Sequence, residues 1–261
     1  LEQVTTSSLD ALRKYSEGDR ALDAGEIPRA RSMFEAAIAL DSAFAMAHRK
    51  LSVVLNNVDL ERSRMVAESR RAYELRNRLP ERERLQAIAS YRMSLHQSGD
   101  SNVATYRQLL ETWPEDKAAL NNLALVLNVR HRYAEAEEVA LRGLAFHPRT
   151  SSLYDNAIEA LVAQNKLARA DSVLLAWGTK VATSPFRLGA GAQIAAARGD
   201  YARAERFADS LVGRGIPGAA RAGHRLKSNI FRTQGRLAVA EREGLEVMAL
   251  FFSAGDMEHA F

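Results

Sequence analysis

One short pattern recurs along the chain and limits the folds that it can adopt. A small or polar residue is followed two positions later by a large apolar residue, and alanine comes three positions after that. Three of the alanines, Ala136, Ala170 and Ala204, are 34 residues apart. Two short helices with their turns occupy about 34 residues, so the chain is expected to be a series of helical hairpins. The pattern begins at these positions: Gly25, His131, Asn165, Gly199, Gly235 and Gly255.

Composition agrees with a helical chain. The 15 glycines and 6 prolines make 21 of 261 residues, about 8% against a background of about 12%, so turns are few and regular elements are long. No stretch approaches the ~18 uncharged apolar residues of a membrane span, and no secretory signal is found. The absence of cysteine excludes disulfides and thiol nucleophiles and leaves the compartment open. A chain that begins with Leu1 instead of Met is expected to be a fragment.

Each residue of the pattern has a place in a helical hairpin. Glycines such as Gly199 and Gly235 lie where one helix must end, and glycine adopts a left-handed backbone without steric cost. The alanine five residues later is small enough for the second helix to lie close against the first. Tyr133 and Tyr201, between these two positions, are expected to fill the corner of the hairpin.

The segment from Gly18 resembles the tetratricopeptide repeat, with Ala21, Gly25, Phe34 and Ala37 at the matching positions. The resemblance implies an all-α fold, a right-handed α-solenoid of about seven helical hairpins that form one domain over residues 1–261. The repeats are expected at about 11–44, 45–79, 80–116, 117–150, 151–184, 185–220 and 221–253, with 254–261 as a partial repeat or cap.

Residues that favour the start of a helix, and the distance between repeats along the chain, refine these boundaries. Ser7 with Asp10 is expected to form a capping box, Ser184 precedes Pro185 as an N-cap, and another helix starts after Pro80. From Gly25 to His131 there are 106 residues, or 3 × 34 + 4. The four extra residues are expected mainly in 56–64 and in the charged helix beyond.

The sequence carries no motif of a known catalytic or metal site. There is no phosphate-binding loop and no His-Glu-x-x-His, and the six histidines lack the spacing of metal ligands. Gly189 and Gly191 lie in a helix-forming stretch instead of following a strand, and no Gly-x-Ser-x-Gly elbow occurs. We expect no enzyme activity in this chain, no metal and no cofactor.

The charge of the chain does not indicate nucleic-acid binding. The net charge is only +4, and the run from Glu61 to Arg84 contains five glutamates beside its eight arginines. Spacing predicts that Glu74 pairs with Arg78 and Glu68 with Arg71, so this helix is expected to neutralise itself. Base stacking would need several aromatic residues there, and the run has only one tyrosine.

The repeat resemblance implies a concave inner wall lined by the first helix of each repeat, which binds a peptide or protein segment. Asparagines on that wall can hold a peptide backbone because each amide both donates and accepts hydrogen bonds. Asn122 and Asn156 match the helix-packing asparagine of the family. A carboxylate clamp found in some members is not expected, because Tyr15 and Asp19 replace its first lysine and asparagine. Repeat phase places these residues on the wall: Tyr15, Asp19, Arg49, Val53, Ala87, Tyr91, Asn121, Leu125, Asn128, Asp155, Glu159, Gln193, Arg225, Asn229 and Arg232.

Residues 1–18 and 79–85 are similar to the start of the repeat region in multidomain bacterial serine/threonine kinases. This resemblance implies a sensory or docking region on the extracytoplasmic side of a membrane-anchored protein; without it, the expected location is the cytoplasm. The kinase domain itself would lie elsewhere, because the chain has no His-Arg-Asp or Asp-Phe-Gly motif. Bacterial transcriptional regulators contain related repeats and stay an alternative.

The leading hypothesis is therefore a non-catalytic module for protein or peptide binding, within a larger signalling protein. A structural spacer or self-association module is the alternative, with Phe251 and Phe252 either as exposed contact residues or as a cover of the last hairpin. The sequence leaves the partner, the compartment and the oligomeric state open.

Overall fold

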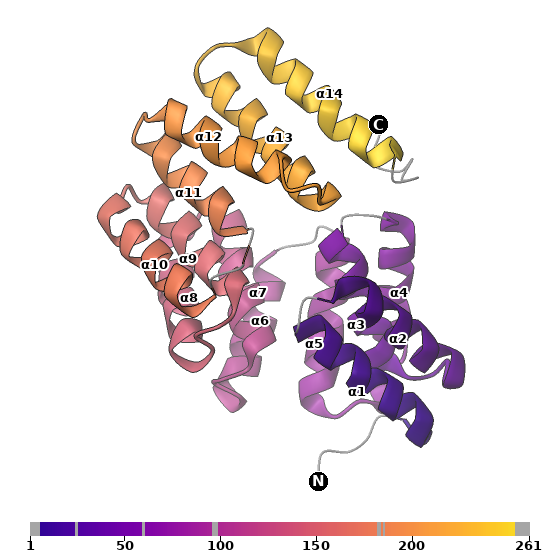
Figure 1. Ribbon diagram of the computed structural model, residues 1–261. Helices are drawn as coiled ribbons and strands as arrows, with labels where there is room; N and C mark the ends of the chain where they lie inside the picture. Colours follow the sequence, from indigo (N-terminus) through magenta and orange to yellow (C-terminus); the bar gives the residue numbers. More distant parts are fainter. Residues whose placement is uncertain are drawn as a thin grey trace. The chain divides into compact units, whose positions relative to one another are not determined.

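The computed structural model describes residues 6–23, 26–58, 61–95, 99–181, 184 and 186–253, and within them every regular element is a helix (Figure 1). Two compact units divide the chain, and we describe each by itself. Unit 1 extends to Leu109 and unit 2 begins at Leu110, so the boundary falls in the last turn of one helix. Unit 1 contains α1 (Leu9–Asp23), α2 (Ile27–Leu40), α3 (Ala45–Val58), α4 (Arg62–Glu74), the short 3-10 helix η1 (Arg76–Arg78), α5 (Glu81–Ser94) and most of α6 (Asp100–Thr112). Unit 2 contains α7 (Lys117–Val129), α8 (Tyr133–Phe146), α9 (Ser151–Ala163), α10 (Leu167–Lys180), α11 (Phe186–Ala197), α12 (Tyr201–Val212), α13 (Pro217–Thr233) and α14 (Leu237–Ser253).

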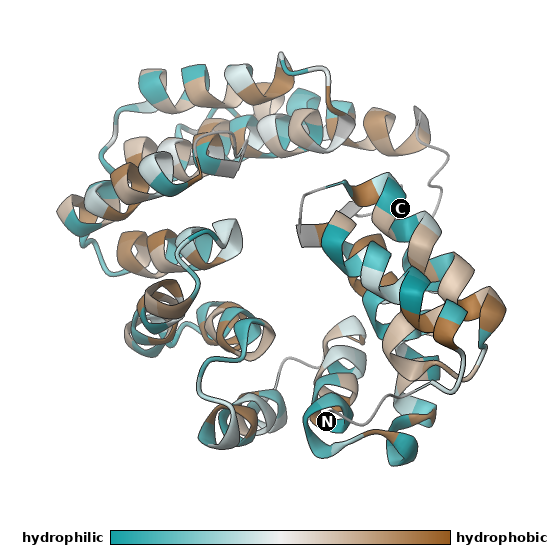
Figure 2. Ribbon diagram, turned by 60° about the horizontal axis from the view of Figure 1, so that its bottom comes forward, coloured by the Kyte–Doolittle hydropathy of each residue, from teal (hydrophilic) through white to brown (hydrophobic). Residues whose placement is uncertain are grey.

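Each odd-numbered helix is joined by a short turn to the next even-numbered helix (Figure 1). Seven such pairs lie in the described residues, and they differ from the predicted ranges in that α1 begins at Leu9 and α13 at Pro217, before the predicted starts at 11 and 221. The first helices also pack side by side, α1 with α3 and α3 with α5 in unit 1, and α7, α9, α11 and α13 in order in unit 2. Figure 2 shows hydrophilic and hydrophobic residues on each helix, as in helices with one buried and one wet side. The all-α hairpin fold is confirmed; a single domain and a right-handed twist stay predictions, and residues 254–261 lie outside the described part.

The first residue of the sequence pattern has the same backbone conformation in four repeats. His131, Asn165, Gly199 and Gly235 have φ values of 57°, 56°, 76° and 74°. In each case the next residue donates its N–H to a carbonyl five residues earlier, as from Arg132 to Leu127 at 2.9 Å. This is the Schellman end of a helix, which glycine adopts freely and which asparagine tolerates. Gly25, the same position in the first repeat, lies outside the described residues.

The repeated alanine lies in the same environment in every repeat where the structure describes it. Ala30, Ala136, Ala170 and Ala204 are fully buried, and Ala240 is 1% exposed. These side chains lie in the second helix of each hairpin, where close approach leaves room for a methyl group and little more. The predicted role of alanine is thus confirmed.

The glycine at position 18 of the first repeat is explained by one close contact. A Cβ atom on Gly18 would lie 2.8 Å from the Phe34 ring, so the ring occupies the space that a side chain would need. Phe34 is fully buried, and its ring contacts Tyr15 at a centroid distance of 5.7 Å. In unit 2 a comparable anchor is Trp177, which is fully buried and stacked on Tyr154 at 5.5 Å.

Several local predictions are corrected by the structure. The three residues between α3 and α4 are the usual number, and the longer connections are Leu75–Pro80, which contains η1, and the five residues between α5 and α6. Leu75 and Leu79 are buried in the core of unit 1, which fixes the first of these connections. The hydroxyl that caps α1 belongs to Ser8, not Ser7, and accepts the N–H of Ala11 at 3.2 Å.

Other local predictions have different outcomes. Helix α5 begins after Pro80 as expected. The Ser184 hydroxyl is buried without a hydrogen-bond partner, so it does not form the predicted cap, and Pro185 is outside the described residues. Tyr201 packs partly buried against the hairpin core, which agrees with a corner-filling role. Phe251 is 8% exposed, which agrees with a cover of the last hairpin, whereas Phe252 is 42% exposed, as a contact residue would be.

Candidate functional site

The predicted binding residues all lie on the first helices of the repeats. We call the surface of α1, α3 and α5 the first-helix wall of unit 1, and that of α7, α9, α11 and α13 the first-helix wall of unit 2. Because the positions of the two units are not related to each other here, each wall is a separate candidate site.

In unit 1, several predicted wall residues have partners within the protein. Tyr15 packs partly buried between the rings of Phe34 and Phe44. Asp19 forms an ion pair with Lys50, and the Tyr91 ring packs at a tilt against Tyr73 with ring centroids 4.8 Å apart. Two more wall positions are apolar: Val53 is partly buried, and Ala87 is fully buried in the core.

Arg49 differs from these residues. Its side chain lies on α3 and the residue is 6% exposed, yet Nε has no hydrogen-bond partner, and no described carboxylate pairs with it. Burial raises the pKa of the nearby Tyr15 phenol far above its ordinary value, and the positive charge of Arg49 opposes that rise.

In unit 2, the asparagines connect the first helices. Asn128 is 2% exposed and donates to the backbone oxygen of Asn156 at 2.9 Å. Asn156 donates to the backbone and side-chain oxygens of Asn121, both at 3.2 Å, and Asn121 donates to Asn122 at 3.1 Å. These bonds agree with the packing role expected for Asn156, and they show that Asn128 offers no exposed side chain to a ligand.

An acidic pair one turn apart stands on α9 without a partner. Asp155 is partly buried and Glu159 is exposed, and no described residue forms an ion pair or a side-chain hydrogen bond with either. Burial, with a smaller contribution from the charge of Glu159, raises the pKa of Asp155 to about 6. Burial also raises the pKa of Glu159. A cation placed beside the pair would favour the charged form of both carboxylates.

The remaining predicted residues of unit 2 leave their side chains available. Gln193 on α11 and Leu125 on α7 are partly exposed, and α7 packs against α9, which carries the acidic pair. On α13, Arg225, Asn229 and Arg232 are exposed, and their side chains form no hydrogen bond or ion pair with a described residue. The wall of unit 2 thus carries free acidic, basic, amide and apolar groups.

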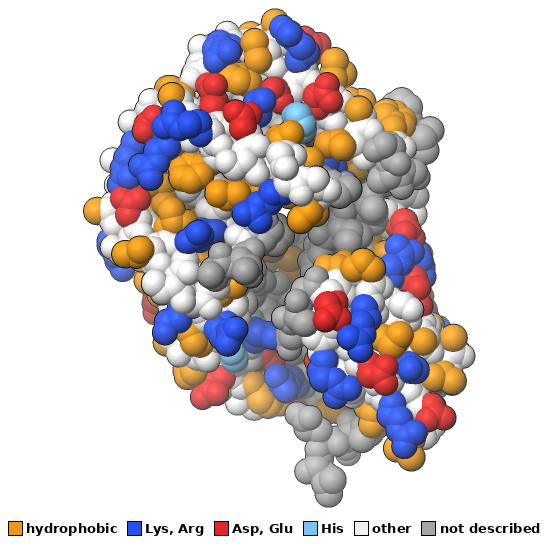
Figure 3. Space-filling view, viewed as in Figure 1, with side chains coloured by type: hydrophobic (Ala, Val, Ile, Leu, Met, Phe, Trp, Pro, Cys, Tyr) orange, Lys and Arg blue, Asp and Glu red, His pale blue; other side chains and the backbone are white. Residues whose placement is uncertain are grey.

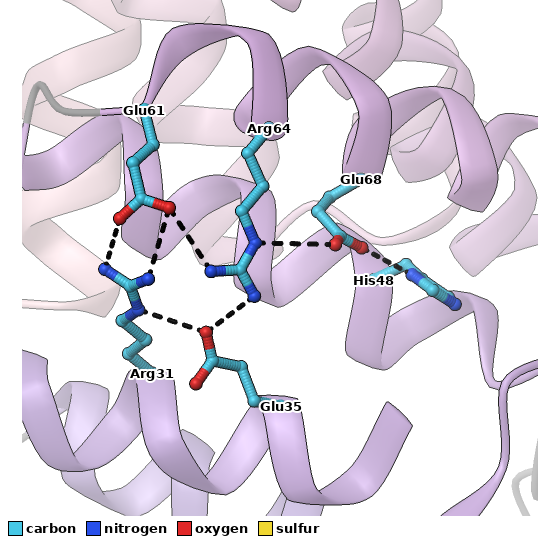
Figure 4. Close-up of polar contacts among 6 residues, drawn as sticks. All are labelled: Arg31, Glu35, His48, Glu61, Arg64 and Glu68. Carbon is cyan, nitrogen blue, oxygen red and sulfur yellow. Dashed lines mark hydrogen bonds and ion pairs between the residues drawn. The ribbon is translucent and has the colours of Figure 1, made fainter. Parts of the chain in front are cut away.

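The second-helix side of unit 1 holds a network of ion pairs (Figure 4). Arg31 on α2 pairs with Glu61 at 2.6 Å and with Glu35 at 3.1 Å. Arg64 on α4 pairs with the same two carboxylates, at 3.2 Å to Glu61 and 2.6 Å to Glu35. Hydrogen bonds from Arg31, which outweigh the effect of burial, hold the pKa of Glu61 below its ordinary value.

A buried histidine extends the network. His48 on α3 lies with Nδ1 2.6 Å from Glu68 and Nε2 3.1 Å from the Ser42 carbonyl. Each ring nitrogen of His48 thus faces an oxygen of another segment. Sequence analysis did not single out this residue, since its partners lie on other segments.

Charge pairing in the 61–84 run is confirmed, but the partners differ from those predicted. Glu74 pairs with Arg71 at 3.4 Å instead of with Arg78, and Glu68 pairs with His48 and Arg64 instead of with Arg71. The predicted pairs considered only neighbours along one helix, whereas the partners of Glu68 include His48 on α3. On the face in Figure 3, acidic and basic side chains are interspersed.

Buried charges of unit 2 outside the wall are also paired. Glu137, 6% exposed, accepts hydrogen bonds from Lys166 at 2.7 Å and Gln164 at 3.0 Å. Burial alone would raise the pKa of Glu137, but these bonds hold it below the ordinary value. Glu243 is similarly held by His224 at 2.7 Å and Lys227 at 2.9 Å. These groups stabilise neighbouring hairpins.

Two further observations limit the chemistry of the described residues. They contain no group of three or more histidine, aspartate or glutamate side chains placed to hold a metal ion. None of their helices combines the length and the apolar character that crossing a bilayer requires.

Comparison with known proteins agrees with the hairpin geometry. The tetratricopeptide repeat family matches residues 15–76 and 97–149. A search of curated proteins gave no match. These two segments, together 115 of the 261 residues, resemble tetratricopeptide repeats.

Solved structures resemble the fold at low sequence identity. A Rap protein complexed with competence and sporulation factor is 14% identical, with a TM-score of 0.70 over 95% of this chain and 76% of that one. The Rap conjugation gene regulator of plasmid pLS20, complexed with the Phr* peptide, is 14% identical, with a TM-score of 0.66 over 95% and 74%. A tetratricopeptide repeat protein from Parabacteroides merdae is 14% identical, with a TM-score of 0.60 over 93% and 94%. These similarities concern the fold.

Proposed function

We propose that the chain is a non-catalytic module that binds a peptide or protein segment on the first-helix wall of unit 2. The observation that carries this proposal is the acidic pair of Asp155 and Glu159, which is partly desolvated and lacks a cation. Elsewhere in the unit, the carboxylate of Glu137, which is 6% exposed, has two cations beside it. A buried charge without a partner is costly, so a ligand that brings a cation gains affinity.

The neighbouring groups suit an extended peptide. Lysine or arginine of the ligand would pair with Asp155 and Glu159, while Gln193 and Asn229 can each donate to and accept from its backbone. Leu125 offers an apolar contact, and Arg225 with Arg232 would favour an acidic residue farther along the segment. A few such contacts give micromolar affinity, which corresponds to about 8 kcal/mol.

The fold neighbours support the choice of ligand. Two of them, both Rap proteins, were solved with bound partners, and one of these is named as a peptide. Proteins that share this fold thus include one that binds a peptide. We carry the ligand class, and not any particular peptide, to this chain.

We further propose that the module is the sensory or docking region of a larger bacterial signalling protein. The similarity of residues 1–18 and 79–85 to the repeat regions of serine/threonine kinases supports this context, and it would place the module on the extracytoplasmic side of a membrane. A transcriptional regulator would place it in the cytoplasm. The sequences on either side of this chain in its gene would decide between the two.

The binding proposal is tested with a displayed library of random peptides. Segments selected on the wild-type chain are expected to be enriched in lysine or arginine. The double variant Asp155→Asn with Glu159→Gln is expected to bind these segments with at least tenfold lower affinity. The matched control removes the same charge from two exposed carboxylates on second helices, Glu138→Gln with Glu241→Gln, and is expected to leave affinity unchanged. Equal loss in both double variants, or none in either, would contradict the proposal.

Self-association stays the second candidate because Leu245, Met248 and Phe252 are exposed on one side of α14. Their spacing of three and four residues places them on one helical face. A module that self-associates through this face should increase in mass with concentration in sedimentation, and Phe252→Ser should reduce the increase. A peptide receptor alone should stay at one mass.

A further inference from the structure

Helix α14, the last described helix of unit 2, has one open side (Figure 1). Counted from the repeated alanine, Gly244 of α14 corresponds to Ala208 of α12, and Met248 follows at the position of Val212. In α12 these positions lie against the next first helix, because a Cβ atom on Gly223 of α13 would be 2.7 Å from the Ala208 oxygen and from Val212. In α14 a Cβ atom on Gly244 would point into open space, and Met248 is 36% exposed. The side that α13 covers on α12 is thus uncovered on α14 among the described residues.

The open side of α14 carries an apolar stripe. Leu237, Leu245 and Phe252 are 66%, 56% and 42% exposed. We define the stripe by its spacing of three and four residues, which places its members on one helical face: Leu237, Glu241, Gly244, Leu245, Met248 and Phe252. Glu241 is its single charged member. Contiguous exposed apolar side chains of this kind mark a surface that contacts another protein surface.

The stripe is complementary to itself when a second copy of α14 runs antiparallel. Three pairs then share one midpoint, between residues 244 and 245: Leu237 with Phe252, Glu241 with Met248, and Gly244 with Leu245. Leu245 of each copy enters the space that Gly244 of the other leaves open. In a parallel pair each residue would face its own copy, so two Glu241 carboxylates would repel each other and two glycines would leave a gap.

We propose that α14 pairs with α14 of a second copy, antiparallel, around a two-fold axis between Gly244 and Leu245. A two-fold contact of this kind closes on itself and yields a dimer. One helix pair buries less than the roughly 1,200 Å² of stable complexes, so the dimer should be weak and depend on concentration. The proposal rests on the proposed function only in deepening its second candidate, self-association, and it uses no residue of the first-helix walls.

Single cysteines report the pairing because the chain has none of its own. Leu245→Cys lies beside the axis and should form a disulfide with its own copy under mild oxidation, since bridged Cα atoms must come within about 7 Å. Leu237→Cys and Phe252→Cys are separated by about 22 Å along the helix. Each should stay unlinked alone, and the two should link when mixed. Leu175→Cys, which is 72% exposed on α10, is the matched control and should stay unlinked.

A second measurement uses the charge in the stripe. Glu241→Leu removes the carboxylate that the pairing places beside Met248, so it should lower the dissociation constant of the dimer in sedimentation roughly threefold or more. An unchanged or higher dissociation constant would overturn the proposal. Linking of Leu237→Cys or Phe252→Cys to its own copy, or equal linking of Leu175→Cys, would also overturn it.

The outcomes also separate this pairing from the rest of the proposed function. A mass that increases with concentration, while Leu245→Cys stays unlinked, would overturn the pairing and leave self-association through another face. One mass at every concentration would overturn both. The linked Leu245→Cys dimer should bind a peptide selected on the wild-type chain with unchanged affinity, because the first-helix wall lies on other helices. Failure of the peptide test would therefore leave the result at α14 interpretable.

Discussion

In unit 1, the arginines of the second-helix side and the arginine of the first-helix wall have opposite surroundings. Arg31 and Arg64 lie in a partly exposed network where each cation meets two carboxylates (Figure 4). Arg49 is buried on the neighbouring α3 without any described carboxylate partner. Unit 2 shows the same difference for carboxylates, since Glu137 is paired with cations and the acidic pair on α9 is not.

This difference separates charges that hold hairpins together from charges that are available to a ligand. A paired surface charge costs little and contributes little. An unpaired charge in a partly buried place reduces stability, and a protein that retains one gains from it elsewhere, commonly in binding. Variants that remove single charges should show this distinction in the free energy of unfolding.

Asp155→Asn should stabilise the protein near neutral pH. The pKa of Asp155 is raised from 3.8 to about 6, so the folded state prefers the protonated form. The stability contributed by this group is complete below pH 3.8 and is lost as the pH rises through 6. Denaturation in urea at pH 7.5 should show a gain of about 1–2 kcal/mol for the variant, after allowance for partial exposure. Near pH 3.5 the gain should vanish; an equal gain at both pH values would show that charge is not the cause.

Arg49→Met and Arg64→Met should change stability in opposite directions. Methionine has a similar length and removes the cation in both cases. At Arg49 it removes an unpaired buried charge, so we expect a gain of about 1 kcal/mol. At Arg64 it breaks pairs that are partly exposed, so we expect a loss of about 0.5–1 kcal/mol. Urea denaturation of both variants at low salt measures the difference; losses of similar size would mean that Arg49 has an internal partner.

The coupling between Arg31 and Glu61 should be small. A double-mutant cycle with Arg31→Ala and Glu61→Ala is expected to give about 0.5 kcal/mol, because both side chains are roughly one-third exposed. Raising the salt concentration to about 1 M should remove most of this coupling, since screening then acts within about 3 Å. A salt-independent coupling above 2 kcal/mol would contradict the description of this network as a surface feature.

The hairpin architecture could be predicted from sequence because it depends on local and periodic signals. The pattern ending in Ala136, Ala170 and Ala204 recurs with the period of one helix pair, and each repeat buries its alanine in the same way. Even the left-handed turn at His131 and Asn165 follows from their place in the pattern, although neither is glycine. The extra residues between Gly25 and His131 were misplaced because their position depends on how Leu75 and Leu79 are buried.

The state of the charged groups could not be predicted from sequence. Arg31 contacts Glu61, thirty residues away, and His48 contacts Glu68, twenty residues away. Spacing along one helix therefore predicted the wrong partner for Glu68. Repeat phase placed Arg49 and Asp155 on the first-helix walls, but only the packed structure distinguishes them from Asp19, which has a partner. Burial of Phe251 likewise depends on α13, whose Arg221 lies 4.8 Å from its ring.

The central claim is that a ligand binds where the charges are unpaired. The most direct measurement is a backbone amide NMR map of the chain with a peptide selected on it. In unit 2 the shifted signals are expected to concentrate on α7, α9, α11 and α13. The amides of Asp155, Glu159 and Gln193 should be among those with the largest shifts. Shifts concentrated on the second helices α8, α10 and α12 would contradict this claim.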